Sequence, residues 1–362
     1  MTLSVLHVIT TINLGGAEKQ LLTLVNHQRK RGYEVCVIFL KDNPALLNHF
    51  LNADVRVEMS FIGLSFLDQI AALRKIAKLA VIVHAHLPRA ELLCALALEK
   101  STFIVTRHNS EPFFLKGGKF LSIILSRFVF MKAFACISIS RTVLEFLKTS
   151  REINNKTNSK IIYYGLEDTR VWPKDPSHNI PKPLKIGTVS RLVPQKNIPL
   201  LLKAFKELTE KYPSSFELSI VGVGPLKSQL QLLSDQLEIG GLTYWKDECN
   251  DVNRFYRSLD IFVLSSDYEG FGLVLLEAMA QGIPVIARRI SAIPEVLGDG
   301  HPALIESNSP CELAEKIWKV LNDKVLLESC LRFQAERLLE FSIEKTFMDH
   351  EEIYKKLLEN LN

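Results

Sequence analysis

Short apolar runs alternate with helix-length amphipathic segments along almost the whole chain, and this alternation constrains the fold more than any other feature. Helical patterns cover, for example, residues 18–31, 199–211 and 226–237. Strands that alternate with helices form parallel sheets with helices packed on both faces. The sequence therefore predicts an α/β protein. The expected strands are 5–9, 35–39, 81–84, 103–106, 135–139, 161–164, 185–189, 217–221, 242–245, 261–264 and 285–287.

A proline-rich polar stretch divides this pattern. Four of the residues from 167 to 183 are proline and most of the others are polar, which is the composition of a connection between domains. At 362 residues, the chain is also long for one hydrophobic core. We therefore expect a first domain over 1–166 and a second over 184–341. The amphipathic segment 342–362 is expected to form a helix that packs back on the first domain.

Composition argues against several classes of protein. No stretch of 18 apolar residues lacks a charged residue, so we expect no membrane-spanning helix, and the N-terminus lacks the basic start of a secretory signal. The six cysteines are widely spaced and form neither a C-x2-C pair nor a zinc pattern. We therefore expect free thiols in a reducing cytoplasm, and neither a bound metal nor another cofactor.

Charge is distributed unevenly along the sequence. Residues 1–165 contain 21 Lys and Arg and 11 Asp and Glu, a net charge of +10, whereas the remainder contains 23 and 29, a net charge of −6. The basic first part suggests an anionic acceptor or a membrane surface as its partner, or a solvated face without a role.

A glycine pair follows the first expected strand and opens a helix. Gly15 and Gly16 allow a ligand to approach the backbone closely, and a helix N-terminus offers N–H groups to an anion. A tight structural turn would use the same residues. The segment is not G-x-G-x-x-G, which weakens the case for a dinucleotide-dependent oxidoreductase.

Two cations follow the first strand of the second domain. Arg191 and Lys196 lie in a strand-to-helix loop, at the carboxyl edge of the sheet, where ligands bind in such folds. A planar guanidinium and a compact ammonium together suit a diphosphate.

Two carboxylates flank the start of a later helix. Glu269 precedes an apolar helix that begins near Gly272, and Glu277 lies within it. A carboxylate on so apolar a segment is costly unless it has partners. Sugar hydroxyls could supply them, and the helix N–H groups near Phe271, Leu273 and Val274 could bind phosphate.

The chain resembles the retaining glycosyltransferases of family 4, which have the GT-B fold of two Rossmann-like domains facing across a cleft. The E-x7-E pattern from Glu269 to Glu277 is that family's most specific signature. The Arg191 and Lys196 pair resembles its diphosphate clamp, and Gly15-Gly16 its N-terminal glycine loop. The similarity extends over nearly the whole chain.

This resemblance implies roles for particular residues. Gly15 and Gly16 would approach the donor phosphates from the first domain. Arg191, Lys196 and the backbone at Gly272, Leu273 and Val274 would bind the diphosphate. Glu269 and Phe271 would contact the transferred sugar, and Glu277 the ribose. His108 would lie near the reacting sugar, so His108 and Glu269 are the candidate catalytic residues.

Two positions depart from the family pattern. Tyr164 stands where the family often has Asn, in the segment after the last strand of the first domain. Asp247 stands where a glycine is common, in a loop that usually lies near the nucleotide base. The identity of the base therefore stays open.

The predicted activity is transfer of a hexose-type sugar from a UDP- or GDP-sugar, with retention and without a metal, because fixed cations stabilise the leaving diphosphate. A saccharide or lipid-linked acceptor, as in envelope polysaccharide or lipopolysaccharide biosynthesis, is expected, and nucleic acid is not. The alternatives are a sugar-nucleotide epimerase or phosphorylase of the same architecture, a catalytically silent sugar-nucleotide-binding subunit, and an oxidoreductase.

Residues 113–132 form a basic and apolar segment of helical character. Lys119 and Arg127 are eight residues apart and therefore share one helix face, with Phe120, Ile123 and Ile124 on or beside it. Such a helix can lie on an anionic bilayer. It can equally be an ordinary crossover helix. The first domain is therefore expected in the cytoplasm, with docking at the inner face of the cell membrane as a hypothesis.

Overall fold

The structure is a computed structural model that describes residues 4–42, 44–113, 118–171, 183–249 and 251–361. The chain forms two compact units, one of residues 1–167 with 341–362 and one of residues 168–340. All six cysteines are free thiols. No helix in the described part of the chain is both long and apolar enough to cross a membrane.

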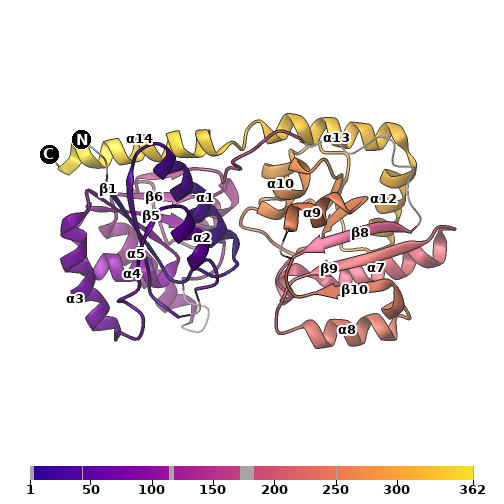
Figure 1. Cartoon of the computed structure of the whole chain (residues 1–362), viewed down its shortest axis with the longest axis horizontal. Helices are drawn as coiled ribbons and strands as arrows, with labels where there is room; N and C mark the ends of the chain where they lie inside the picture. The colour runs from indigo at the N-terminus through magenta and orange to yellow at the C-terminus, as the bar shows by residue number, and fades with distance from the viewer. Residues whose placement is uncertain (1–3, 43, 114–117, 172–182, 250, 362) are drawn as a thin grey trace. The chain divides into compact units, whose positions relative to one another are not determined.

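The first unit contains a seven-stranded parallel sheet with the strand order β3-β2-β1-β4-β5-β6-β7 (Figure 1). The chain moves outward from β1 to β3 and then continues on the other side of β1 with β4, which is a doubly wound arrangement. Its strands are β1 (Ser4–Ile9), β2 (Glu34–Phe39), β3 (Arg56–Glu58), β4 (Ile82–His86), β5 (Phe103–Arg107), β6 (Ala135–Ser138) and β7 (Ser159–Ile161).

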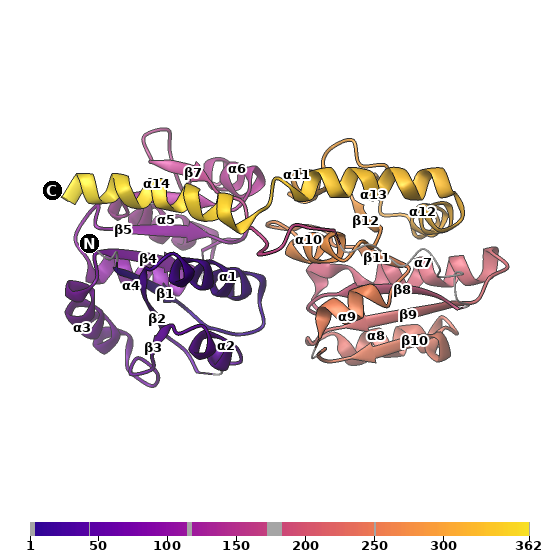
Figure 2. The same cartoon turned by 45° about the horizontal axis from the view of Figure 1, so that its top comes forward.

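Helices cover both faces of this sheet. On one face α14 lies beside α1 and β4 (Figures 1 and 2), and on the other α4 packs between α3 and α5. The helices of this unit are α1 (Gly16–Lys30), α2 (Leu47–Asn52), α3 (Phe66–Ile76), α4 (Pro88–Ala97), α5 (Lys119–Lys132), α6 (Arg141–Thr149) and α14 (Ile343–Leu361), with a 3-10 turn η1 (Ala77–Leu79).

The second unit contains a six-stranded parallel sheet with the order β10-β9-β8-β11-β12-β13. Its strands are β8 (Leu184–Val189), β9 (Phe216–Val221), β10 (Thr243–Lys246), β11 (Ile261–Leu264), β12 (Val285–Arg288) and β13 (Leu304–Ile305). Its helices are α7 (Ile198–Lys211), α8 (Lys227–Gln236), α9 (Val252–Arg257), α10 (Leu273–Ala280), α11 (Ile293–Leu297), α12 (Pro310–Asn322) and α13 (Lys324–Leu338), with 3-10 turns η2 (Pro194–Lys196) and η3 (Gly240–Leu242).

The terminal helix α14 belongs to the first unit, because it packs against the first sheet. Phe347, Ile353 and Leu357 are buried in the hydrophobic core beneath β1, β2 and β4. The chain enters this position through a parallel bridge between Leu166 and Ser342. Burial of this apolar stripe is what holds the last segment of the chain against the first sheet.

Most expected strands coincide with strands of the structure to within two residues at each end. The run 161–164 differs, because β7 ends at Ile161 and Tyr164 lies in the segment that follows, with its side chain buried. The short strands β3 and β13 were not predicted. They have three and two residues, which is too short for an alternating pattern to be recognised.

Candidate active site

The carboxyl ends of β8 and β11 meet at the topological switch point of the second sheet. From β8 the chain moves to β9 and β10 on one side, and then returns to β11 on the other side of β8. Open α/β sheets bind ligands at this point, because the loops that leave the two neighbouring strands diverge there. The loop after β8 carries Arg191 and Lys196, and the loop after β11 carries Glu269.

Lys196 and Glu269 form an ion pair at this switch point. The distance from Lys196 Nζ to Glu269 Oε1 is 2.6 Å, and their side chains are only 12% and 7% exposed. The same carboxylate oxygen accepts a hydrogen bond from Ser266 Oγ at 2.6 Å. The structure thus brings together a cation and a carboxylate that are 73 residues apart in the sequence.

Several hydrogen bonds fix the two loops against each other. The Asp267 amide donates to the carbonyl of Gln195 at 2.8 Å, and Ser265 Oγ donates to the carbonyl of Lys196 at 2.9 Å. Asn197, which has a left-handed backbone with φ of 44°, donates from Nδ2 to Asp267 Oδ1 at 2.9 Å. The position of Lys196 is therefore determined by backbone contacts on both sides of it.

Arg191 lies at the surface of the same loop. Its side chain is exposed, and its Nη2 is 3.5 Å from Gln195 Oε1, which is the outer limit of a hydrogen bond. Arg191 is therefore not part of the Lys196–Glu269 pair, and its guanidinium lies at the surface.

The helix α10 begins directly after this pair. Gly272 is its N-cap residue, with φ of 96° and no side-chain cap, a conformation that favours glycine. Phe271 is buried, whereas Leu273 and Val274 in the first turn are half-buried. The first N–H groups of a helix have no partner within the helix, so this turn is chemically suited to an anion.

Glu277 lies within α10, eight residues after Glu269, and has a partner of its own. The hydroxyl of Tyr256, from α9, donates to Glu277 Oε2 at 2.8 Å. Burial raises the pKa of Tyr256 well above its usual value, and the charge of Glu277 adds to that effect. Tyr256 is therefore a neutral donor that orients Glu277.

Two features of this site were missed by the sequence analysis. Gly222, after β9, has φ of 147°, and a Cβ atom there would lie 1.8 Å from the carbonyl oxygen of Ser190. Arg288, the last residue of β12, donates from Nη1 to Asp267 Oδ1 at 2.6 Å. The glycine-rich turn after the expected strand 217–221 and the arginine pair after 285–287 are the signals that would have indicated them.

In the first unit, Gly15 and Gly16 have different surroundings. A Cβ atom on Gly15 would lie 2.2 Å from Glu18 Oε2, because the Glu18 side chain folds back over the helix start and accepts a hydrogen bond from Thr11 at 2.8 Å. A Cβ atom on Gly16 would meet nothing within 4 Å. The neighbour of Gly15 is thus the end of a flexible side chain, whereas Gly16 presents an open backbone at the N-terminus of α1.

His108 follows β5 and is held from both ring nitrogens. Its Nδ1 lies 2.6 Å from the hydroxyl of Tyr164, and its Nε2 lies 3.0 Å from Nδ1 of His86. Burial lowers the pKa of His108 to about 3. Burial raises the pKa of Tyr164 well above its usual value, and the charge of Glu18 adds to that effect.

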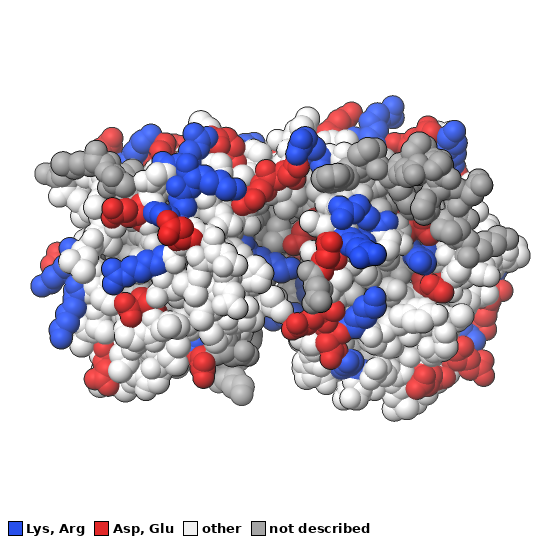
Figure 3. Space-filling model, in the orientation of Figure 1, with Lys and Arg blue, Asp and Glu red and all other residues white. Residues whose placement is uncertain are grey.

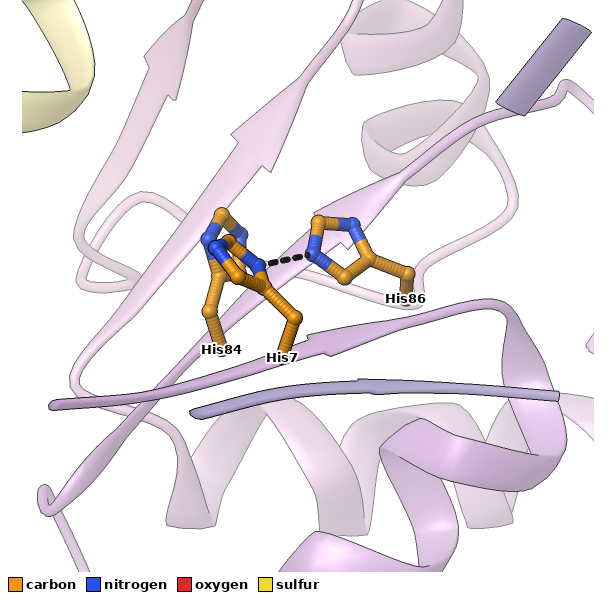
Figure 4. A group of neighbouring side chains, drawn as sticks. All are labelled: His7, His84 and His86. Atoms are coloured by element: carbon orange, nitrogen blue, oxygen red, sulfur yellow. Dashed lines mark hydrogen bonds between the residues drawn. The ribbon is translucent and has the colours of Figure 1, made fainter. Parts of the chain in front are cut away.

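Behind His108 lies a group of buried histidines (Figure 4). His7 of β1 and His84 and His86 of β4 point to the same face of the sheet, because His7 is in register with His84 and alternate residues of a strand share a face. Burial lowers the pKa of His7 to about 4 and those of His84 and His86 well below the usual value. All three are therefore neutral at pH 7.

These three imidazoles are also the set of side chains that could hold a metal ion in the described part of the chain, because their nitrogens lie within 4.8 Å of one another. Neutral imidazole is a zinc ligand. Their nitrogens, however, already have protein partners. His7 Nε2 bonds Gln28, and His84 bonds Tyr354 and Thr106. The hydrogen bonds satisfy the group without a metal.

In comparisons with known proteins, both units match glycosyltransferases. The model described as Glycosyltransferase Family 4 matches residues 14–170, and that described as Glycosyl transferases group 1 matches residues 171–337. The N-acetyl-alpha-D-glucosaminyl L-malate synthase of Bacillus anthracis is 25% identical over 295 residues, which is 76% of this chain and 75% of that one. The poly(ribitol-phosphate) alpha-N-acetylglucosaminyltransferase of Staphylococcus aureus is 29% identical over 155 residues, 41% of this chain and 31% of that one.

A solved structure extends the similarity to the whole fold. The crystal structure of Anabaena HepE in complex with UDP and glucose has a TM-score of 0.82 and 19% identity, and the match covers 98% of this chain and 100% of that one. The two parallel α/β sheets, together with both family models, identify a glycosyltransferase of the GT-B type. The chain belongs to the family 4-like glycosyltransferases, because the Family 4 model matches its first part and the model of glycosyl transferases group 1 matches its second.

Proposed function

We propose that the protein transfers a hexose-type sugar from a UDP- or GDP-sugar, with retention of configuration and without a metal ion, to a saccharide or lipid-linked acceptor of the cell envelope. The observation that carries this proposal is the Lys196–Glu269 pair at the switch point of the second sheet, 2.6 Å apart and nearly buried. UDP and UDP-glucose bound to HepE, and the glucosaminyl transfers named for the two relatives, support a donor of this class.

In this proposal Lys196 leaves its ion pair with Glu269 and pairs with the leaving diphosphate. Lys196, Arg191 and the first N–H groups of α10, at Gly272, Leu273 and Val274, stabilise the negative charge that grows as the sugar–phosphate bond breaks. Glu269, released from its cation, accepts hydrogen bonds from the sugar beside Phe271.

The remaining assignments follow the same logic. Glu277, which Tyr256 orients, accepts hydrogen bonds from the ribose hydroxyls. Gly15, Gly16 and His108 are the first unit's contribution to substrate binding.

A donor panel in the presence of EDTA tests both the donor class and the absence of a metal. A donor at about 100 times its Kd stabilises the protein by about 2.7 kcal/mol, so UDP- or GDP-sugars should raise the melting temperature and ADP-sugars should not. The shift and the release of nucleotide should be unchanged by EDTA, because protein cations replace the metal. Loss of activity in EDTA that Mg²⁺ or Mn²⁺ restores would contradict the proposal.

We further propose that the first unit reaches its acceptor by docking α5 on an anionic membrane. The inner side of this helix carries Ser122 and Ser126, which are buried, while the outer side exposes large apolar side chains. The exposed fractions are 78% for Phe120, 46% for Ile124 and 63% for Met131. An amphipathic helix of a globular protein normally has the opposite arrangement.

The reason for the inverted pattern lies beneath the helix. Ser126 Oγ donates to the buried Glu152, and Arg107 Nη2 lies 3.2 Å from the same carboxylate, so part of the inner side of α5 packs on a polar cluster. Val129 and Phe130, nearer the end of the helix, are buried as well. Phe120, Ile124 and Met131 remain outside. Lys116 lies outside the described residues, as does the side chain of Lys119, so the structural argument rests on the apolar face and on Arg127, which is exposed.

Charge alone would not support this docking surface. On the face of the first unit seen in Figure 3, basic and acidic side chains are interspersed. The membrane hypothesis therefore depends on apolar insertion, with Arg127 contributing about 1 kcal/mol of attraction to anionic lipid.

Vesicle sedimentation tests the docking surface. The protein should bind phosphatidylglycerol vesicles but not phosphatidylcholine vesicles, and binding should weaken as salt rises. The Phe120→Asp/Arg127→Glu variant should lose binding, because it removes insertion and reverses the charge. The control is Val325→Asp on α13, whose side chain is also 78% exposed. Equal loss in the control, or no binding by the parent, would favour an acceptor in solution.

A further inference from the structure

A continuous series of hydrogen bonds runs from Tyr164 into the core of the first unit. Tyr164 contacts His108, His108 contacts His86 and His86 contacts His7, at 2.6, 3.0 and 3.0 Å. His7 Nε2 then lies 2.9 Å from Gln28 Oε1. Each histidine uses Nδ1 on one side and Nε2 on the other, so no ring of this series has a spare nitrogen.

The Gln28 amide assigns the direction of every bond in the series. Its Nε2 donates to the hydroxyl of Tyr354, so its Oε1 is the acceptor that faces His7. His7 must then carry its proton on Nε2 and accept on Nδ1. The same reasoning gives an Nε2–H tautomer to His86 and to His108, each of which accepts on Nδ1.

We propose that Tyr164, His86, His7 and Gln28 are positioning residues that fix His108 as its Nε2–H tautomer, with Nδ1 as the hydrogen-bond acceptor of the ring. This inference rests on the proposed function only in assigning His108 to substrate binding. Tyr164, where the family often has Asn, is the hydroxyl donor that holds Nδ1 in the free protein.

The end of the series excludes a proton relay. A relay needs an acceptor that can take up a proton, and the series ends on an amide oxygen and a phenol, which remain neutral. Burial lowers the pKa of each histidine in it, so an added proton is disfavoured throughout. A cavity of about 20 Å³ beside His86, His108 and Tyr164 has room for about one water molecule, which limits access of solvent to the bonds.

The direction of the bonds gives the proposal a test that needs no activity. The Gln28→Leu variant removes the acceptor of His7 Nε2–H. A buried N–H without a partner is costly, whereas the reversed series leaves only an acceptor unpaired. His7, His86 and His108 should therefore change together to the Nδ1–H tautomer, with His108 donating to Tyr164.

Nitrogen NMR of the ¹⁵N-histidine-labelled protein at pH 7 distinguishes the two tautomers. The parent should show His7, His86 and His108 as Nε2–H, and Gln28→Leu should show all three reversed. The control is Gln69→Leu, an equally buried glutamine of the same unit that donates to the carbonyls of Leu40 and Phe61. It should leave the tautomers unchanged.

Kinetics provide the second readout. Tyr164→Phe should lower the rate of UDP release from UDP-glucose about tenfold, which is the effect of one hydrogen bond. The affinity for UDP should be unchanged. Tyr33→Phe is the matched control, because Tyr33 is equally buried and donates to Glu351 instead.

If the parent fails to turn over any sugar nucleotide, the proposed function fails while the tautomers still test the series. An Nδ1–H His108 in the parent, or one equivalent of zinc retained after dialysis, would overturn the inference.

Discussion

Lys196→Ala should weaken UDP binding about 10- to 150-fold, the range expected for one charge-assisted hydrogen bond of about 1.5–3 kcal/mol. It should also lower the stability of the second unit by about 3 kcal/mol, because Glu269, only 7% exposed, would lose its cation. Titration calorimetry with UDP and chemical unfolding measure the two effects. Glu269→Ala should spare UDP binding, because the cation remains, and should damage sugar transfer.

A double variant separates the two effects of Lys196. Lys196→Met/Glu269→Gln removes both charges, so stability should recover while UDP binding stays weak. Lys211→Ala is the control for loss of a lysine from an ion pair. Lys211 lies 2.6 Å from Glu315, but the two side chains are 46% and 40% exposed, so stability should hardly change. Parent-like UDP affinity in Lys196→Ala would place the diphosphate elsewhere.

Acidification from pH 7 to pH 5 should unfold the first unit before the second. Burial lowers the pKa of five histidines in the first unit, whereas in the described part of the second unit it lowers that of His301. Below pH 6.5 the unfolded first unit therefore binds more protons than the folded one. Each such histidine costs about 2 kcal/mol of stability by pH 5. The five are His7, His84, His86, His108 and His350.

One group acts in the opposite direction. Burial raises the pKa of Glu91 to about 7, so the folded protein binds this proton more readily and gains stability as the pH falls from about 7 towards 4.5. A shift of that size contributes about 3 kcal/mol. It offsets part of the loss from the five histidines, and the net effect remains destabilising.

Separate probes distinguish the two units in this experiment. All three tryptophans of the sequence lie between residues 168 and 340, so tryptophan emission reports the second unit. Hydrogen exchange in peptides from β1, β4 and β5 reports the first. Exchange should rise between pH 6.5 and pH 5 before the emission changes. A change in emission that comes first would contradict the assignment of the acid-sensitive groups.

The sequence by itself determined the fold class and the family. Apolar runs at strand spacing and amphipathic runs at helix spacing depend on local periodicity, which a single chain displays directly. The predicted α/β architecture with parallel sheets and the family 4 assignment are both confirmed. The positions of Lys196 and Glu269 in loops after strands followed from the same pattern.

Only the tertiary structure decided which of these residues meet. Lys196 pairs with Glu269 because β8 and β11 are neighbours in the sheet. Along the chain, the loops that carry these two residues are separated by β9, β10 and β11. The series from Tyr164 to Gln28 depends on the register of β1 with β4 and on the docking of α1 and α14 over them. Contacts of this kind depend on packing between distant segments, which local periodicity does not encode.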